Sequence, residues 1–238
     1  MVMFEQLAWS QTDAGVISLT KRDEPMLGVV VYEVKLGDEY LMSSVFTVAE
    51  VALATLGLAA VEGDRALDVI VGGLGLGYTA AAAMHDPRVR DLTVVDALED
   101  VIAWHRDGLV PDAGLDASDP RVTLHLGDFF AEVASGEGFD AHVPGRRWDA
   151  ILLDVDHSPR HTLQPSHAPF YEAAGLRAMR ALIADGGVFA LWSDDPPDEP
   201  FMDALREVWQ DVDAHVVPFG NHYTGGESTN TVYVARDR

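Results

Sequence analysis

The sequence contains no cysteine among its 238 residues. Disulfide bonds, zinc sites built on thiolates and cysteine nucleophiles are therefore excluded. A chain without disulfides fits a cytoplasmic protein, and we predict that location. Lysine is scarce as well: Lys21 and Lys35 are the only two, and the other basic residues are arginines. We attribute this bias to genomic composition and not to function.

Long hydrophobic runs are also missing. The longest apolar stretch, residues 45–61, carries Glu50 near its middle, so it is too short and too interrupted to cross a membrane. Residues 1–15 contain an acid and no basic cluster ahead of an apolar core, so we predict no signal peptide. The sequence therefore predicts a protein that does not act in a membrane.

Positive charge is in short supply. The chain has 39 acidic residues against 16 basic ones, which gives a formal net charge of −23. Such a field repels phosphate backbones, so we expect no nucleic-acid partner and favour a cationic or small neutral one. Solubility alone is the simpler explanation of the charge. The 48% hydrophobic content is enough for an ordinary core, and the length fits one domain with a small appendage.

The hydrophobic pattern changes character along the chain. The first segment is predicted to form strands, with a hairpin over residues 28–44 that turns at Leu36–Glu39, and a helix follows over 46–60. From residue 66 onward, short apolar strands alternate with helices. The expected strands are 66–73, 91–96, 121–128, 148–155, 187–193, 214–220 and 229–236. The first expected helix follows the strand at 66–73 and ends near residue 84. The other expected helices cover 97–109, 129–134, 170–184 and 201–212.

This alternation predicts a parallel sheet that is covered on both faces, with ligands binding where the strands end. The last two strands follow each other without a helix, and an antiparallel end to a parallel sheet is typical of class I methyltransferase folds. We therefore predict an α/β, Rossmann-like class I methyltransferase fold. Its sheet has seven mostly parallel strands and a C-terminal antiparallel hairpin, with a small N-terminal β appendage. The expected boundaries are 1–60 for the N-terminal hairpin region plus helix and 61–238 for the Rossmann-like domain.

A glycine-rich loop follows the first strand of the alternating region. A phosphate-binding P-loop needs a lysine where Tyr78 stands, and the dinucleotide pattern G-x-G-x-x-G lacks its third glycine. The spacing G-x-G-x-G does fit, at Gly73, Gly75 and Gly77, and is found in adenosylmethionine-binding folds. The alternative is a tight turn in which glycine only permits the backbone dihedrals.

Two acids stand at the ends of the next two predicted strands. Asp96 can accept hydrogen bonds from both ribose hydroxyls, and Asp128 can accept the adenine amino group, with Phe129 beside it as a face for the ring. The alternative for each acid is a helix N-cap or a first-turn acid. Because three features end three successive strands, we predict an adenosyl site. Its predicted residues are Gly73, Gly75, Gly77, Asp96, Asp128 and Phe129.

At this point the sequence resembles a known family. The motifs VIVGGLGLGYT, LTVVDALEDVIAWH, DPRVTLHLGDFF, WDAILLDVDHSP and GVFALWS are similar in order and spacing to those of the spermidine synthase family and its bacterial relatives. The resemblance covers residues 66–193. It implies a class I methyltransferase fold, a small N-terminal β domain, a homodimer in many members, and S-adenosylmethionine or its decarboxylated form as the cofactor.

The resemblance also has departures. Gly75 stands where the family typically has an aspartate that holds the amine of the aminopropyl donor. Asp154 matches the first aspartate of the motif after the fourth strand, and His157 falls where the second belongs. The family's Tyr-His-Glu run before the core is missing, and Glu50 alone remains of it. The ribose and adenine sites are thus retained, whereas the acids that read the polyamine are altered.

The catalytic candidates lie on the loop after the fourth strand. Transfer from a sulfonium releases a neutral thioether, so the reaction needs an aligned, deprotonated nucleophile more than an acid. Asp154, Asp156 and His157 could orient or deprotonate that nucleophile, and an ordinary histidine pKa of about 6.5 suits a base. The alternatives are that Asp154 braces the loop, that Asp156 is solvated and that His157 is an ordinary loop histidine. The histidines on this loop lack a ligand spacing, so we predict no metal.

We favour an S-adenosylmethionine-dependent transferase of the spermidine synthase-like branch that methylates a small molecule. The alternative is aminopropyl transfer from decarboxylated S-adenosylmethionine to an amine, with Asp154 and Asp156 taking over the usual roles. A third hypothesis is a non-catalytic protein that binds an adenosyl ligand or a partner protein.

Overall fold

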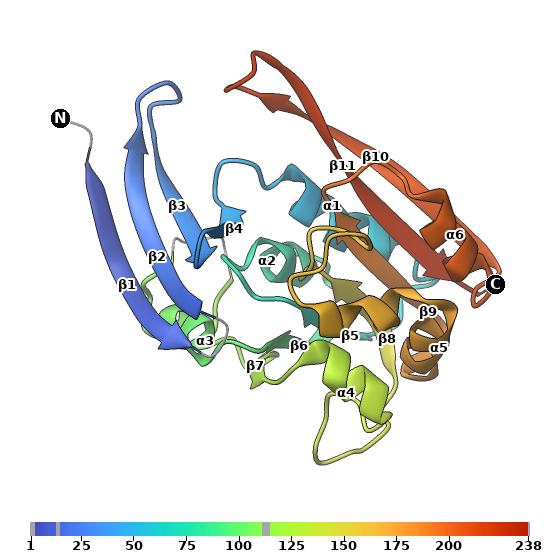
Figure 1. The fold of residues 1–238 in the computed structure, drawn as a ribbon. Coiled ribbons are helices and arrows are strands. Elements are labelled where there is room, and N and C mark those ends of the chain that lie inside the picture. Colours follow the sequence, from blue (N-terminus) through green and yellow to red (C-terminus); the bar gives the residue numbers. More distant parts are fainter. Residues whose placement is uncertain (1–2, 13–14, 111–114, 238) are drawn as a thin grey trace.

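The computed structural model describes residues 3–12, 15–110 and 115–237, and it contains two sheets (Figure 1). The smaller sheet has four antiparallel strands in the order β1-β2-β3-β4. Its strands are β1 (Phe4–Thr12), β2 (Gly15–Glu24), β3 (Val29–Leu36) and β4 (Glu39–Ser43). The register pairs Leu36 with Glu39, which confirms the predicted hairpin turn.

The larger sheet has seven strands in the order β10-β11-β9-β8-β5-β6-β7. Strands β5 to β9 pair in parallel, and β11 pairs antiparallel with both β9 and β10, so β11 alone runs against the other six. The strands are β5 (Leu67–Gly72), β6 (Val89–Asp96), β7 (Val122–Leu126), β8 (Trp148–Leu153), β9 (Ile183–Ser193), β10 (Asp211–Asn221) and β11 (Gly226–Arg236). This order confirms the predicted fold class and its C-terminal hairpin. The chain turns from β5 to one side and reaches β8 on the other, so a ligand-binding crevice is expected at the carboxyl ends of these strands.

Helices cover both faces of the larger sheet. Alternate residues of each central strand point to opposite faces: Val69 and Val71 join one hydrophobic cluster, whereas Ile70 joins the other. The helices on the first face are α1 (Val48–Ala59), α2 (Tyr78–Met84) and α3 (Glu99–Arg106). Those on the second face are α4 (Phe129–Ser135), η1 (Pro165–Tyr171), α5 (Ala173–Ala181) and α6 (Glu199–Arg206). The first cluster also contains Ile17, Leu19 and Val34 of the smaller sheet.

Helix α1 packs on the larger sheet, although it lies before the predicted boundary at residue 60. A Cβ atom on Gly57 would lie 2.6 Å from Cδ2 of Leu152 and 3.1 Å from Cβ of Ala190. Glycine therefore allows a close approach of the helix to β8 and β9. The boundary itself stays a prediction.

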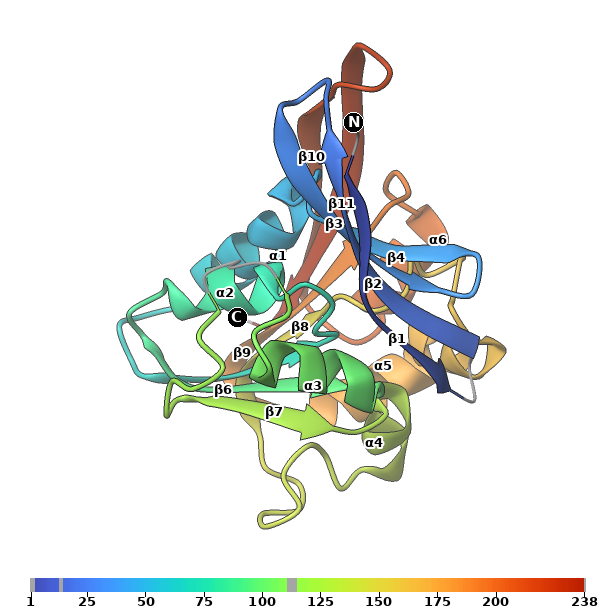
Figure 2. The same ribbon diagram turned by 90° about the vertical axis from the view of Figure 1, so that its left-hand side faces the viewer.

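The two sheets meet again at their far ends, where the β2–β3 turn and the β10–β11 hairpin lie near each other (Figure 2). The hydroxyl of Tyr223 donates to Glu24 Oε2 at 3.0 Å. The rings of Phe46 and Phe219 lie 5.3 Å apart, centroid to centroid. The N-terminal sheet is thus fixed to the larger sheet both at its core and through this hairpin.

Several predicted helices are shorter in the structure, and the helix predicted over 97–109 covers only Glu99–Arg106. The helix predicted over 170–184 ends at Ala181, because β9 begins at Ile183. The helix predicted over 201–212 begins at Glu199, where Asp198 caps it by accepting from Phe201 N at 2.8 Å. It ends at Arg206, and Asp211 already belongs to the β10–β11 ladder. Among the described residues, no helix is long and apolar enough to cross a membrane.

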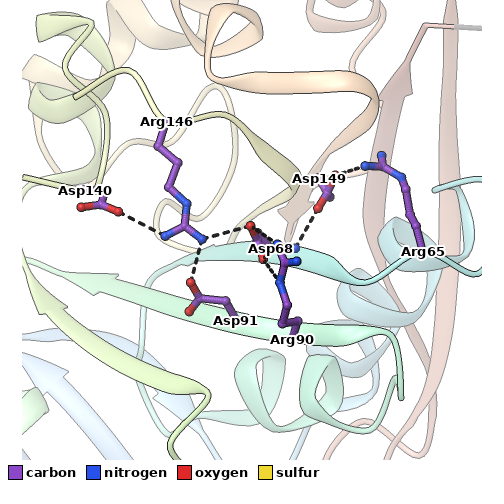
Figure 3. Close-up of polar contacts among 7 residues, drawn as sticks. All are labelled: Arg65, Asp68, Arg90, Asp91, Asp140, Arg146 and Asp149. Atoms are coloured by element: carbon purple, nitrogen blue, oxygen red, sulfur yellow. Dashed lines mark hydrogen bonds and ion pairs between the residues drawn. The ribbon is translucent and has the colours of Figure 1, made fainter. Parts of the chain in front are cut away.

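A network of ion pairs closes the amino ends of β5, β6 and β8 (Figure 3). Arg146 donates to Asp91 at 2.7 Å, lies 3.0 Å from Asp68, and stacks on the ring of Trp148 at 4.0 Å. The network also contains Arg65, Arg90, Asp140 and Asp149. Because this network lies at the amino ends of the strands, we infer that it stabilises the fold. The ligand site is expected at the carboxyl ends, on the opposite edge of the sheet.

Candidate functional site

The glycine loop connects β5 to α2 in a conformation that requires glycine. Gly73, Gly75 and Gly77 have φ angles of 94°, 46° and 86°, in the left-handed region that side chains disfavour. A Cβ on Gly73 would lie 2.0 Å from the carbonyl oxygen of Asp154. The loop is therefore pressed against the end of β8, and the three predicted glycines lie at the carboxyl edge of the sheet.

Strand β4 of the N-terminal sheet covers this loop. The sulfur of Met42 lies 3.2 Å from the backbone nitrogen of Leu76, and a Cβ on Gly75 would lie 2.9 Å from the same sulfur. On the other side of the loop, Nε2 of His105 lies 2.9 Å from the carbonyl oxygen of Gly75. Burial lowers the pKa of His105, so its neutral form is favoured. Gly75 is therefore enclosed on both sides.

Asp96 ends β6 beside the loop. Its carboxylate accepts from the backbone nitrogens of Leu74 at 2.9 Å and Leu98 at 2.8 Å. Burial raises the pKa of Asp96, although these donors and the backbone of Gly75 act in the opposite direction. Asp96 thus holds the glycine loop in place, and its carboxylate keeps acceptor capacity for a further donor. Contact with a ribose stays a prediction.

Asp128 and Phe129 have different surroundings at the end of β7. Oδ1 of Asp128 caps α4 by accepting from Phe130 N at 3.0 Å and Ala131 N at 3.1 Å, which is the predicted alternative. Its Oδ2 accepts nothing from the described residues and remains an acceptor at the carboxyl edge. The ring of Phe129 is 3% exposed and stacks on the ring of Phe139. The ring also packs against Gly72, where a Cβ atom would lie 2.7 Å from Cδ2 of Phe129. It packs in the core beneath the loop.

Asp154 follows β8 and lies in a group of acids. Its Oδ2 accepts from the hydroxyl of Thr79 at 2.7 Å. Its negative charge interacts with that of Glu50 in α1, which is 8% exposed. The charge of Asp194, after β9, also interacts with Glu50. Burial raises the pKa of Asp154 to about 6. Burial, together with the charges of Asp154 and Asp194, raises the pKa of Glu50 to about 8. At neutral pH this group therefore tends to retain a proton.

Asp156 is buried beneath the same loop, with a side chain that is 0% exposed. Its Oδ1 accepts from Leu163 N at 2.7 Å and lies 2.8 Å from Nδ1 of His167. Its Oδ2 accepts from the hydroxyl of Tyr171 at 2.8 Å, and burial beside this carboxylate raises the pKa of Tyr171 well above its usual range. These partners occupy both oxygens. Asp156 therefore holds the loop together, and a catalytic role for it stays a prediction.

His157 directly follows Asp156 in the sequence and is half-buried. Its carbonyl oxygen accepts from Asp194 N at 2.7 Å, and its ring forms no hydrogen bond with the part of the chain that is described. The ring is thus available to a ligand. No group of three or more potential metal-ligating side chains occurs in the described ranges.

The structure brings most of the predicted site residues to one edge and adds one that the sequence analysis left without a role. The three glycines, Asp96, Asp128 and Asp154 meet around the ends of β5 to β8. Glu50 joins them from α1 and was noted only as a remnant of a family motif. The signal that could have identified it is a single acid within an apolar helix, because such an acid is costly to bury without a role.

Comparisons with known proteins follow the same lines. No family model matches the chain. A polyamine aminopropyltransferase of Corynebacterium efficiens is 29% identical over 138 residues, which cover 58% of this chain and 24% of the relative. Putrescine N-methyltransferase 3 of Nicotiana tabacum is 30% identical over 112 residues, which cover 47% of this chain and 27% of the relative. The matches thus span only about a quarter of the length of these relatives.

Solved structures support the fold over most of the chain. Spermidine synthase from Thermotoga maritima superposes with a TM-score of 0.73 at 17% identity, covering 97% of this chain and 72% of the other. Human methyltransferase-like protein 13, solved with SAH, gives 0.61 at 19% identity, covering 80% and 82%. A spermidine synthase structure holds the transition-state analogue AdoDATO and gives 0.72 at 18% identity, covering 97% and 73%. These likenesses confirm the predicted class I methyltransferase fold.

Proposed function

We propose that this spermidine synthase-like chain, with its class I methyltransferase fold, transfers an alkyl group from an S-adenosylmethionine-type donor to a small amine. The observation that carries the proposal is the arrangement at the carboxyl edge. A glycine loop, Asp96 and Asp128 end three adjacent strands, and a group of acids that includes the buried Glu50 lies beside them. The relatives named for aminopropyl transfer and putrescine N-methylation support the amine as acceptor.

The residues fit an adenosyl ligand in their chemistry. The glycine loop has no side chains at its three glycine positions, so a ligand can approach its backbone closely. Asp96 would hold the ribose, and Oδ2 of Asp128 would accept the adenine amino group. When bound, the donor supplies an electrophilic carbon next to a sulfonium. The chain's own part is to orient the amine, to remove its proton and to exclude water.

We favour methyl transfer because of Gly75. In the family that the sequence resembles, an aspartate at this position holds the donor's amine. Without it, the site loses a charge that attracts the ammonium and repels the carboxylate of ordinary S-adenosylmethionine. Met42 occupies the space into which a side chain at this position would extend. Aminopropyl transfer is the second candidate, favoured by the acidic group around Glu50 and Asp154, which suits a diamine.

Calorimetric titration with S-adenosylmethionine, its decarboxylated form and methylthioadenosine tests the proposal. We expect all three to bind, with ordinary S-adenosylmethionine preferred over the decarboxylated form. A preference for the decarboxylated donor would replace methyl transfer by aminopropyl transfer. If none of the three binds, the adenosyl assignment is wrong, and the chain acts as a partner-binding protein or on another ligand.

Single variants assign the roles. Asp96→Ala should weaken donor binding by about 1–3 kcal/mol, because charge-assisted hydrogen bonds are lost. Glu99→Gln is the matched control, since Glu99 is exposed at the start of α3.

If turnover is detected, His157→Ala tests whether the imidazole is the base, and an unaltered pH–rate profile would exclude it. The homodimer that the resemblance implies stays a prediction.

A further inference from the structure

We propose that His105 is a positioning residue for the donor. Together with Met42 it holds the Gly75–Leu76 peptide from opposite sides, and the two side chains fix the loop on which the adenosyl donor lies. The inference rests on the proposed function, because it names what shapes the donor site of that reaction. It gives a role to a histidine that the sequence analysis left without one.

Helix α3 brings the ring of His105 to the glycine loop. His105 follows Val101 by four residues and Ile102 by three, so it shares a helix face with these two buried side chains. His105 is half-buried, and burial lowers the pKa of its imidazole. The uncharged ring is therefore the form that the folded protein favours.

The ring supplies a hydrogen bond that the loop does not make by itself. Nε2 of His105 lies 2.9 Å from the carbonyl oxygen of Gly75, and among the described residues no backbone N–H donates to that oxygen. A carbonyl oxygen can only accept, so the ring must carry a proton on Nε2. In the uncharged ring, Nδ1 is then the nitrogen without a proton.

Met42 binds the other end of the same peptide. Its sulfur lies 3.2 Å from the backbone nitrogen of Leu76, and the part of the chain that is described gives this N–H no other acceptor. Sulfur is a weak acceptor, so the imidazole makes the stronger of the two contacts. Side chains from β4 and α3 thus bind both polar groups of one peptide unit. The peptide cannot rotate without breaking a hydrogen bond.

The ring also packs against the turn at which α2 begins. A Cβ atom on Gly77 would lie 2.9 Å from Cε1 of His105. Gly77 has a φ of 86° and is the N-cap residue of α2. His105 therefore contacts the loop at two of its three glycines, and it fixes the second half of the loop.

The first half of the loop is fixed from β6. Asp96 accepts from Leu74 N at 2.9 Å, and the backbone nitrogen of Gly73 donates to the carbonyl oxygen of Val95 at 2.9 Å. Without His105, only this first half would keep its strong hydrogen bonds. The second half would then have to be ordered when the donor binds, and the cost of that ordering lowers the affinity for the donor.

Nitrogen-15 NMR of the labelled wild-type chain tests the contact without donor or turnover. We expect the His105 signal at pH 7 to be that of a neutral ring with its proton on Nε2. His105→Gln identifies this signal by its disappearance. A neutral ring with its proton on Nδ1 would overturn the proposal, because Nε2 could then not donate to Gly75.

Calorimetry with S-adenosylmethionine separates the hydrogen bond from mere filling of space. Glutamine can place its NH2 group close to where Nε2 of histidine lies, whereas the shorter asparagine cannot. We expect His105→Asn to weaken donor binding by about 3- to 10-fold, and His105→Gln to stay within about twofold of wild type. His85→Asn is the matched control, because His85 is exposed at the other end of α2. Equal losses in the two His105 variants would overturn the proposal, as would wild-type affinity in His105→Asn.

Met42→Leu tests the other side of the peptide and keeps the proposal falsifiable should His105→Asn fold poorly. Leucine conserves the volume but removes the acceptor, so donor binding should weaken by about 2- to 5-fold. Met84→Leu is the control, since Met84 is also half-buried and lies at the far end of α2. Unchanged donor affinity in Met42→Leu would show that the peptide is not held from both sides and would overturn the proposal.

Turnover separates positioning from chemistry. With a turned-over amine, His105→Asn should raise the KM for the donor and leave kcat and the KM for the amine close to wild type. A fall in kcat with an unchanged donor KM would overturn the positioning role. If the wild-type chain binds no adenosyl compound, the proposed function is wrong and the inference falls with it. If the wild-type chain and His105→Asn bind the donor equally well, the inference alone is wrong.

Discussion

The sulfur of Met42 lies directly against the Gly75 position, 2.9 Å from where a Cβ would be built. A strand of the N-terminal sheet thus limits what the donor loop can carry. A single substitution to the aspartate that spermidine synthases typically have here should be costly, because φ of 46° disfavours a side chain and the sulfur occupies its space.

We predict that Gly75→Asp lowers the free energy of unfolding by about 1–3 kcal/mol in urea denaturation. Adding Met42→Ala should recover part of that loss, so the two changes should be non-additive in a double-mutant cycle. Gly28→Asp is the matched control, because Gly28 also has a positive φ of 67° but no atom within 4 Å of its Cβ position. Additive effects of the first two substitutions would show that the sulfur does not restrict the loop.

Asp128 performs one task that the structure shows and one that we propose, and the two can be separated. Asp128→Asn keeps a capping oxygen for α4, so unfolding should change by only a few tenths of a kcal/mol. The same change can turn an amide NH2 toward the adenine amino group, so donor affinity should fall by about tenfold or more. Asp128→Ala removes the cap as well and should cost about 1 kcal/mol of stability. Calorimetry and thermal denaturation of both variants measure the two effects, and equal donor affinity in Asp128→Asn would exclude the adenine contact.

The sequence could predict the fold because its strands are short, apolar and separated by amphipathic helices. It could place Asp96 and Asp128, because an acid that directly follows a parallel strand lies at the ligand edge whatever the packing. It could not decide between Asp154 and Asp156, which stand two residues apart in one loop. Their difference depends on His167 and Tyr171, which η1 brings beneath Asp156.

The position of Glu50 beside Asp154 could not be predicted from the sequence for a related reason. Its proximity to Asp154 is created by the approach of α1 to the sheet at Gly57, a contact between segments far apart in the chain. Periodicity shows that residues 46–60 form a helix, but it does not show which strand ends the helix will face. Burial then raises the pKa values of both acids, an effect that exists only in the folded protein.

The hydrogen bonds that Asp156 accepts from Leu163, His167 and Tyr171 should be essential for the stability of the fold. Asp156→Ala leaves His167 and Tyr171 buried without their shared acceptor, so we predict a loss of about 3 kcal/mol or more in the free energy of unfolding. His161→Ala is the control on the same loop, because this histidine is exposed and its hydrogen bonds run through the backbone. Urea denaturation measures both. A loss below about 1 kcal/mol in Asp156→Ala would mean that the three contacts do not hold the loop.

The raised pKa values of Glu50 and Asp154 should make the stability of the protein depend on pH. Their folded pKa values, about 8 and about 6, lie above their ordinary values of 4.5 and 3.8. The folded state therefore binds more protons than the unfolded state between about pH 4 and pH 8, and stability falls as pH rises through this window. Their stabilising contribution is fully present below about pH 4 and lost above about pH 8.

Glu50→Gln removes the larger part of this dependence. We expect the variant to match wild type near pH 4.5 and to exceed it above pH 8, by on the order of a few kcal/mol. The difference between the two unfolding curves, measured in urea from pH 4.5 to pH 9, isolates this pair from the other acids of a chain with a net charge of −23. Glu62→Gln should give a flat difference curve, since that side chain is 87% exposed. A flat curve for Glu50→Gln as well would mean that Glu50 ionises normally in the folded protein.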